Sequence, residues 1–326
     1  MKYFNIPGFY DHLDLNKFFI RLQSEHPEYF YEDIKIASVF GNFHFCPWDG
    51  GRNFLYYNKQ QTKEEVIRIA DLYNSADIPL RLVFTNPTIE ANDLHDRYCN
   101  MILRELDNGM NEVCVNSEIL EEYIREKYPN YKIVSSTTKR LITPEKSLQE
   151  LNKDYYQVCL DYDLNHNLEY LESIPMELRH KVEFLSNAIC RPHCPIRKQH
   201  YYYTGRAQKT WMKEGYDIDH GCNIKHTLTH PSKLGKENNL SLEDLDKYSK
   251  MGFKYFKLEG RTIPSSTMFG CYLYYFIKPE AYFEVISIVG SVMGVFVNDP
   301  NGPIKGDIKF RKDEEISVAK NKMLLY

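Results

Sequence analysis

The chain has 326 residues, with 41 Lys and Arg against 45 Asp and Glu, which gives a formal net charge of −4. This length is compatible with one large α/β domain, and the charge balance lacks the basic excess of a dedicated nucleic-acid-binding protein. The N-terminal residues do not resemble a secretion signal, and the apolar stretch 281–297 is short for a bilayer span and contains Glu284. The sequence therefore predicts a cytoplasmic protein without a membrane span.

Eight short runs rich in apolar, β-branched and aromatic residues predict β-strands along the chain. They lie at residues 2–7, 34–40, 80–85, 112–116, 131–136, 155–160, 181–187 and 253–258. Helix-like segments separate most of them: one begins with a Thr62 cap followed by Glu65, and another begins at Ser117. Strands that alternate with helices form parallel βα units, and eight such units favour a TIM-type (β/α)8 barrel of the α/β class. An open doubly wound sheet has the same periodicity and is the alternative.

We expect the barrel domain to cover residues 1–280, and we expect a C-terminal helix and tail at residues 281–326 to pack on it. In this interpretation residues 191–222, between the seventh and eighth strands, form a long excursion over the barrel mouth. No glycine-rich dinucleotide-binding or Walker motif follows a predicted strand, so the sequence does not support an NAD or ATP site.

Polar residues follow most of the predicted strands, and in a barrel they would meet on the carboxyl-end face, where barrel enzymes bind their substrates. We predict that four of them bind substrate, namely His44, Asn86, Asn116 and Asn187. We predict catalytic roles for Glu259, Arg261, His200 and Asp161. The alternatives are a structural ion pair for Glu259 and Arg261, helix capping for Asp161, Asn116 and Asn187, and a structural role for His200.

The eight cysteines fall into two groups. Cys114 and Cys159 lie in strand-like runs, and Cys99 and Cys271 lie in helix-like segments, which is typical of buried core thiols. The second group can reach the carboxyl-end face and consists of Cys46, Cys190, Cys194 and Cys222. Four thiolates there would satisfy an iron-sulfur cluster or a zinc ion, and zinc fits nearly as well with three of them plus His193 or His220. Unrelated thiols are the remaining alternative.

Several motifs resemble peptidase family U32, the collagenase-like proteins. The segment "KLEGR" at 257–261 looks like that family's K-[IL]-E-G-R strand ending, and "CRPHC" at 190–194 is followed by "RKQHY". The opening "MKYFNIPGF", and then "IKIASVFGNFHFC", is similar to the short subfamily that acts in oxygen-independent ubiquinone hydroxylation. The resemblance covers roughly residues 1–280, and it implies an α/β barrel with a 4Fe-4S cluster held by four cysteines.

Within this resemblance, Cys46, Cys190 and Cys194 match three of the subfamily's cysteines. The relatives place a further cysteine upstream of the close pair, whereas residues 160–189 contain none here, so Cys222 is the nearest substitute. A cluster with three protein ligands is the alternative, and its open iron would bind and polarise a substrate oxygen.

The resemblance implies an enzyme that hydroxylates a small molecule without molecular oxygen, or that catalyses a related oxygen or sulfur transfer. We consider peptidase activity unsupported, since the sequence has no H-E-x-x-H or G-x-S-x-G motif and the reachable thiols serve better as ligands. The alternative function is an RNA-modifying or RNA-binding protein with a structural metal, because residues 191–213 interleave six basic residues with aromatic ones. A homodimer, or a heterodimer with a related barrel protein, is a further expectation from the resemblance.

Overall fold

The computed structural model describes residues 1–51, 60–211, 239–261 and 263–293, and its eight strands close into a barrel. The strands follow one another around the barrel in sequence order, and all neighbouring pairs are parallel, including the closing pair of β1 and β8. They are β1 (Lys2–Pro7), β2 (Ile34–Gly41), β3 (Leu80–Phe84), β4 (Glu112–Val115), β5 (Lys132–Ser135), β6 (Gln157–Cys159), β7 (Val182–Leu185) and β8 (Tyr255–Lys257). The predicted (β/α)8 barrel is confirmed, because each predicted run overlaps one strand.

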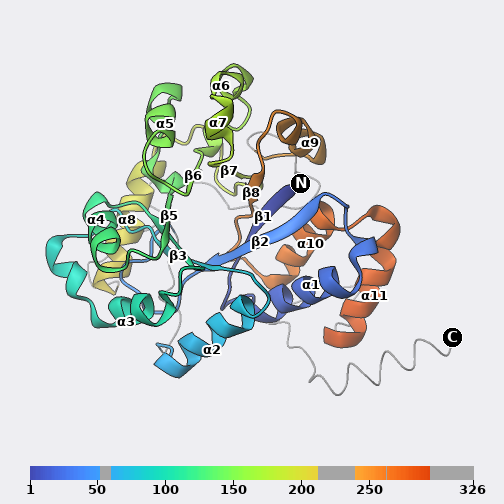
Figure 1. Cartoon of the computed structure of the whole chain (residues 1–326), viewed down its shortest axis with the longest axis horizontal. Coiled ribbons are helices and arrows are strands. Elements are labelled where there is room, and N and C mark those ends of the chain that lie inside the picture. Colours follow the sequence, from blue (N-terminus) through green and yellow to red (C-terminus); the bar gives the residue numbers. More distant parts are fainter. Residues whose placement is uncertain (52–59, 212–238, 262, 294–326) are drawn as a thin grey trace.

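Helices surround the strands, as Figure 1 shows. They are α1 (Leu13–Glu25), α2 (Lys63–Asn74), α3 (Arg97–Leu106), α4 (Glu118–Lys127), α5 (Pro144–Leu151), α6 (Leu168–Ser173), α7 (Met176–Arg179), α8 (Arg197–Thr210), α9 (Leu242–Lys250), α10 (Ser265–Phe276) and α11 (Tyr282–Met293). Short 3-10 turns are η1 (Pro27–Tyr29), η2 (Ala91–His95), η3 (Thr137–Lys139), η4 (Tyr162–Leu164) and η6 (Pro279–Ala281).

The predicted helix starts are correct, but only one of them has the expected capping chemistry. The Thr62 hydroxyl accepts a hydrogen bond from Glu65 N, and the Glu65 carboxylate accepts one from Thr62 N, so α2 begins with a full capping box. Ser117 precedes α4 as predicted, yet its side chain makes no capping hydrogen bond.

The barrel interior contains a layer of charged and amide side chains. Arg81 on β3 is fully buried and reaches Glu112 on β4, Gln157 on β6 and Glu183 on β7. Asn5 on β1 also donates a hydrogen bond to Glu183. Buried charges need such partners, because an unpaired charge in an apolar interior is strongly destabilising. The apolar core lies outside this layer, between the strands and the helices.

The described part of the C-terminal segment is α11, which buries Val285 and Val289 against the core and leaves Phe283 78% exposed. Within the described ranges, no helix is long and apolar enough to cross a membrane. Residues 294–326 lie outside the described residues, so the predicted tail and the division into two domains stay predictions.

Candidate active site at the barrel mouth

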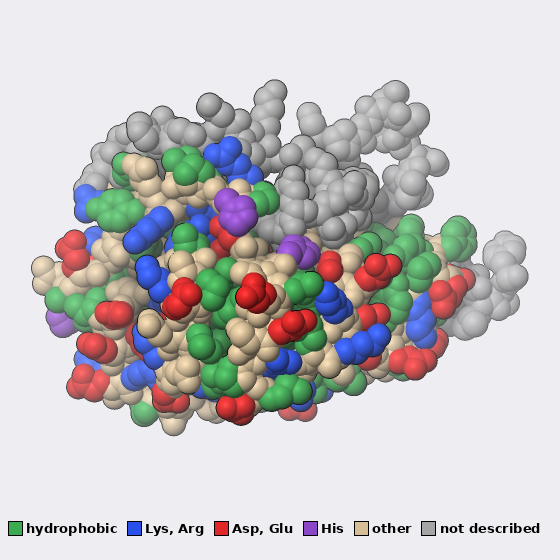
Figure 2. All heavy atoms as spheres, turned by 90° about the horizontal axis from the view of Figure 1, so that it is seen from above, with side chains coloured by type: hydrophobic (Ala, Val, Ile, Leu, Met, Phe, Trp, Pro, Cys, Tyr) green, Lys and Arg blue, Asp and Glu red, His purple; other side chains and the backbone are tan. Residues whose placement is uncertain are grey.

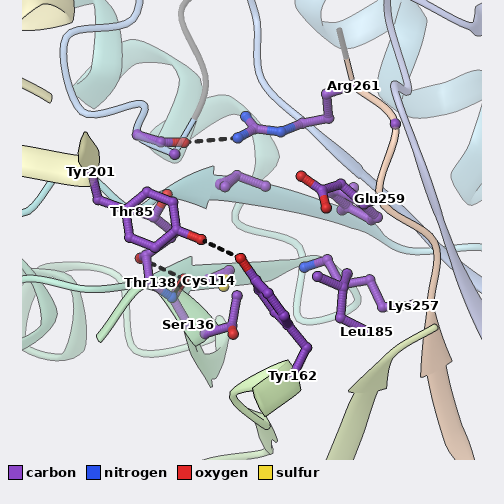
Figure 3. A pocket seen from close by; sticks show the side chains of 16 residues that line it. Thr85, Cys114, Ser136, Thr138, Tyr162, Leu185, Tyr201, Lys257, Glu259 and Arg261 are labelled. Carbon is purple, nitrogen blue, oxygen red and sulfur yellow. Dashed lines mark hydrogen bonds between the residues drawn. The ribbon is translucent and has the colours of Figure 1, made fainter. Parts of the chain in front are cut away.

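A pocket opens at the carboxyl ends of the strands, and its volume is about 560 Å³ including the part open to solvent. Its polar lining side chains are Thr85, Ser136, Thr137, Thr138, Lys257, Glu259 and Arg261. Its apolar and aromatic lining side chains are Phe40, Val83, Cys114, Tyr162, Leu185 and Tyr201, and most of the lining residues are labelled in Figure 3. This size and mixed character are typical of small-molecule sites.

The segment 257–261 supplies all three charged side chains of the described pocket lining. Successive side chains of extended backbone point to opposite sides. The pocket side therefore has Lys257, Glu259 and Arg261, and the other side has Leu258 and Gly260. Leu258 is fully buried in the core. A β-carbon on Gly260 would lie 2.1 Å from Sδ of Met268 on α10, so a larger residue there would require the Met268 side chain to move.

His12 anchors the turn that follows Glu259. Its Nε2 lies 2.8 Å from Gly260 O, and its Nδ1 lies 2.8 Å from Ser265 Oγ. Burial lowers the pKa of His12, so at neutral pH the ring is uncharged, with one donor and one acceptor nitrogen. Nε2–H therefore donates to the carbonyl, and Nδ1 accepts from the serine hydroxyl.

Asn187 fixes the position of Glu259. Asn187 Nδ2 donates to Glu259 O at 2.9 Å, and Glu259 N donates to Asn187 Oδ1 at 2.6 Å. The Glu259 carboxylate accepts a further hydrogen bond from Ile189 N at 2.9 Å. The fully buried amide of Asn187 is thus engaged with the backbone of Glu259, and the predicted substrate contact of Asn187 stays a prediction.

Arg261 forms an ion pair with Asp49, a partner that the sequence did not indicate, and its predicted catalytic role stays a prediction. Its Nη1 donates to Asp49 Oδ1 at 2.7 Å, and its Nη2 donates to Gly50 O at 2.8 Å. Burial raises the pKa of Asp49, and the positive charge of Arg261 opposes this effect. Gly50 packs so tightly that a β-carbon would lie 2.4 Å from Thr85 O. Arg261 therefore locks the loop 46–51 in place as one wall of the pocket.

Helix α8 crosses the mouth and contacts loops on both sides of it. Near its end, Gln208 Nε2 donates to Cys46 O at 3.1 Å, and Gly205 O accepts from Asn86 Nδ2 at 3.0 Å. At its start, Arg197 is buried and pairs with Asp163 at 3.0 Å. The described part of the predicted excursion, residues 191–211, thus lies over the mouth as expected. Residues 212–222 lie outside the described residues.

Two tyrosines, Tyr201 on α8 and Tyr162 on η4, form part of the pocket rim. Tyr162 OH and Tyr201 OH are 3.3 Å apart, and the Arg197 guanidinium lies 4.1 Å from the centre of the Tyr162 ring. Tyr201 belongs to the segment 191–213, whose aromatic and basic residues suggested RNA binding, and nothing in the sequence singled out Tyr162. No sequence signal pointed to these residues, because the course of α8 brings them together.

The thiols form two separate pairs in the structure. Cys46 Sγ lies 2.9 Å from Cys99 Sγ, and both residues are fully buried. Cys190 and Cys194 interact at the start of α8, where Ile196 N and Arg191 lower the pKa of Cys194 against the opposing effect of burial. The helix-like context of Cys99 indicated a core thiol, and no sequence signal indicated its contact with Cys46.

The two thiol pairs lie at opposite ends of α8. At one end of the helix Arg197 interacts with Cys190, and at the other end Gln208 binds the carbonyl of Cys46. About 16 Å of helix separates Arg197 from Gln208. In the part of the chain that the structure describes, no three His, Cys, Asp or Glu side chains are arranged to hold a metal ion. Cys222 and His220 lie outside the described residues. The described thiols therefore do not fit a single four-thiolate site.

The other predicted residues follow the strands as expected. The strands of a closed parallel barrel end one or two residues before each member of a set of five predicted residues, so their predicted placement on one face is confirmed; the five are Asn86, Asn116, Asp161, Asn187 and Glu259. Asn86 also donates to Pro47 O, and it therefore joins the loop 46–51 to α8.

Asn116 and Asp161 both contact neighbouring loops. Asn116 Nδ2 donates to Thr138 Oγ1 at 2.8 Å and so holds a hydroxyl group that lines the pocket. Asp161 caps η4, which matches the capping alternative given for this residue, and it also forms a buried ion pair with Arg140 that the sequence did not indicate.

His44 and His200 lie at different places around the mouth. His44 Nε2 is 2.9 Å from Asp11 Oδ1, so this histidine is held by a buried carboxylate near the start of α1. His200 is half-buried on α8. The predicted roles of both histidines stay predictions.

Lys257 is the charged lining residue that sequence analysis left without a role. It stands two residues before Glu259 in the KLEGR segment, and both side chains line the pocket. The alternation within KLEGR was the signal that could have identified it.

Comparisons with known proteins agree with the barrel fold. No protein-family model matches the chain. The uncharacterized protease MJ1657 of Methanocaldococcus jannaschii is 24% identical over 168 residues, which are 51% of this chain and 50% of that protein, so the match spans about half of this relative's length. The solved structure of the U32 peptidase Mk0906 has a TM-score of 0.50 and 14% identity, and the alignment covers 81% of this chain and 94% of that one. At the level of the fold, the resemblance indicated by the sequence motifs is confirmed.

Proposed function

We infer that this chain belongs to peptidase family U32, and we propose that it is an enzyme that transforms a small molecule at the barrel mouth. The observation that carries this proposal is the pocket of about 560 Å³ at the carboxyl ends of the strands, with the Glu259 carboxylate on its wall. Barrel enzymes place their catalytic groups on this face, and a charged residue in a pocket of this size is a candidate for catalysis.

Glu259 is the best-supported catalytic residue. Its backbone is fixed by Asn187 and its carboxylate is oriented by Ile189 N, so the group is held in one position beside the pocket. A carboxylate that is fixed in this way can accept or donate a proton without losing orientation. Arg261 supports this site by holding the opposite wall through Asp49 and Gly50.

The reaction class that we propose is hydroxylation without molecular oxygen, or a related oxygen or sulfur transfer. This choice rests on the resemblance of KLEGR, CRPHC and the N-terminal segment to the U32 subfamily. Hydroxylation replaces C–H by C–OH, so the carbon loses a proton and two electrons and gains an oxygen atom. We propose that an oxygen-bearing co-substrate gives up the oxygen atom and takes up the two electrons, and that the Glu259 carboxylate, which lines the pocket, receives the proton.

Glu259→Gln should abolish turnover while leaving the fold intact, because the amide keeps the shape of the side chain but cannot accept a proton at neutral pH. Wild-type protein, purified without oxygen, is incubated with a small-molecule extract of the producing cells, and mass spectrometry follows substrate loss and the gain of one oxygen atom. We expect a loss of roughly 100-fold or more in rate for this variant.

Glu177→Gln is the matched control, because Glu177 is exposed on α7. This variant should behave like the wild type. The enzyme proposal would be wrong if wild-type protein consumed no small molecule, and release of peptides from casein would favour the activity named for the relatives.

A 4Fe-4S cluster is our proposal for the cofactor, with zinc as the alternative, and it rests on the sequence resemblance alone. The donor chemistry is suitable, since thiolates select iron-sulfur clusters or zinc. The described arrangement does not fit, because Cys46 lies against Cys99 and the pair Cys190 and Cys194 lies at the other end of α8. When bound, such a cluster would supply electron transfer or Lewis-acid chemistry.

Iron, sulfide and zinc content of anaerobically purified protein tests the cofactor. We expect iron and sulfide, with a broad visible absorption that Cys190→Ala or Cys194→Ala abolishes and that Cys114→Ala leaves intact. Cys114 is the control because it is a buried thiol on β4. Stoichiometric zinc without sulfide would contradict the cluster and support the zinc alternative.

RNA binding is less well supported by the described surface. Arg197 and Lys209, two of the basic residues on α8, are engaged with Asp163 and Asp93 respectively. Figure 2 shows acidic and basic side chains interspersed over the described part of one face. A mixed distribution of charge does not favour a phosphate backbone. Dimerisation with a related barrel protein and a cytoplasmic location stay predictions.

A further inference from the structure

Lys257 is a buried cation whose amine end points into the pocket (Figure 3). Its side chain is 9% exposed, and among the residues that the structure describes none accepts a hydrogen bond from Nζ. The ammonium lies 3.7 Å from Glu183 Oε2 and 4.1 Å from the centre of the Phe40 ring. An ammonium has three N–H donors, and burying such donors without hydrogen-bond acceptors is energetically unfavourable. Acceptors must therefore come from the pocket.

The charged layer below Lys257 keeps this amine in place. Glu183 Oε1 accepts hydrogen bonds from Arg81 and Asn5, and Oε2 has no hydrogen-bond partner in the described structure and is turned to Lys257. Burial alone would raise the pKa of Glu183, but the charges of Arg81 and Lys257 hold it below its usual value. Glu183 thus stays ionised and fixes the ammonium by charge without using its hydrogen-bond donors.

The surroundings of Lys257 in the pocket define what would bind there. Val83 and Leu185 give apolar surface, and the rings of Tyr162 and Tyr201 lie at the rim. Together with the Phe40 ring, this lining suits a flat apolar body, while the single ammonium suits one small anionic group.

We propose that Lys257 binds the acidic group of the substrate and that the substrate is a small carboxylate with a flat apolar body. This inference rests on the proposed function and specifies the substrate class of the same site. The carboxylate supplies the acceptors that Nζ lacks, and the apolar body lies between the tyrosines at the rim and the aliphatic side chains below. Glu259, two residues further along the segment, then stands beside the bound molecule.

Benzoate and benzamide are suitable probes, because they have the same shape and differ in charge. Their binding is measured by ligand-observed NMR titration at pH 7. We expect wild-type protein to bind benzoate at least tenfold more tightly than benzamide, since a hydrogen bond to a charged group carries that difference. Lys257→Arg should keep the preference for benzoate.

Lys257→Met should remove the preference for benzoate. Because this change leaves Glu183 without one cation, the double variant Lys257→Met/Glu183→Gln provides a charge-balanced second test, in which Arg81 still pairs with Glu112. Lys35→Met is the control, since Lys35 is exposed on β2. It should behave like the wild type.

The proposal would be overturned by three results: no benzoate binding to wild-type protein, equal affinity for the two probes, or a benzoate preference that survives in both variants without Lys257. Displacement of benzoate by inorganic phosphate at equal concentration would show a phosphate site and would likewise overturn it. The enzyme proposal fails separately. Benzoate binding that depends on Lys257, in a protein that consumes no small molecule, would leave the binding site standing and remove the catalytic function.

Discussion

Replacing Arg81 with methionine should lower the free energy of unfolding by about 3–5 kcal/mol, the range expected when one partner of a buried ion pair is removed. Arg81 is fully buried inside the barrel and donates to Glu112 at 2.6 Å, to Gln157 at 2.5 Å and to Glu183. The methionine fills most of the same volume but leaves two carboxylates with fewer partners. Urea denaturation at pH 7, followed by circular dichroism, measures the change.

Arg104→Met is the matched control for this loss. Arg104 pairs with Glu105 on the surface of α3, and its side chain is 64% exposed. Exposed ion pairs contribute little, so this variant should lie within about 0.5 kcal/mol of the wild type. If Arg81→Met lowered the free energy of unfolding by less than about 1 kcal/mol, the charged layer would not stabilise the barrel as proposed.

Asp49→Ala should lower the free energy of unfolding by about 3 kcal/mol and should also disorder the pocket wall. The change leaves the Arg261 guanidinium, which is 7% exposed, without its carboxylate partner. The loop 46–51 then loses the ion pair that holds it to the KLEGR segment. Denaturation measures the stability, and benzoate titration measures the pocket.

A double variant separates the ion pair from other effects at this position. Asp49→Ala/Arg261→Met removes both charges, so it should recover part of the stability lost in Asp49→Ala, since neighbouring sites are not additive. If the two single losses simply add in the double variant, Asp49 and Arg261 do not stabilise the protein as a pair.

The barrel could be predicted from the sequence because local patterns and the fold agree. The eight apolar runs are short and separated by helical segments, and this alternation leaves few topologies. The Thr62 cap of α2 was readable because its capping box involves only residues three apart. Ser117 shows the limit of this reasoning, because the right residue stands at the start of α4 without making the bond.

The site was only partly predictable, because long-range contacts decide it. KLEGR identified Glu259 and Arg261 on the pocket wall, but the partner of Arg261 is Asp49, more than 200 residues earlier in the chain. Strand order placed Cys46 on the same face as Cys190 and Cys194. It could not place the ends of α8, nor reveal that Cys99 on α3 would lie against Cys46.

The closing pair of β1 and β8 has a consequence for synthesis on the ribosome. Tyr3 of β1 pairs with Tyr255 of β8, so the two strands are about 250 residues apart in the sequence. At a synthesis rate of roughly 5–20 residues per second, β8 is made about 10–50 seconds after β1. Until then the nascent sheet has two open edges, which can pair with other chains. The finished barrel has no edge, whereas an unfinished or prematurely stopped chain lacking β8 keeps both and is prone to aggregate.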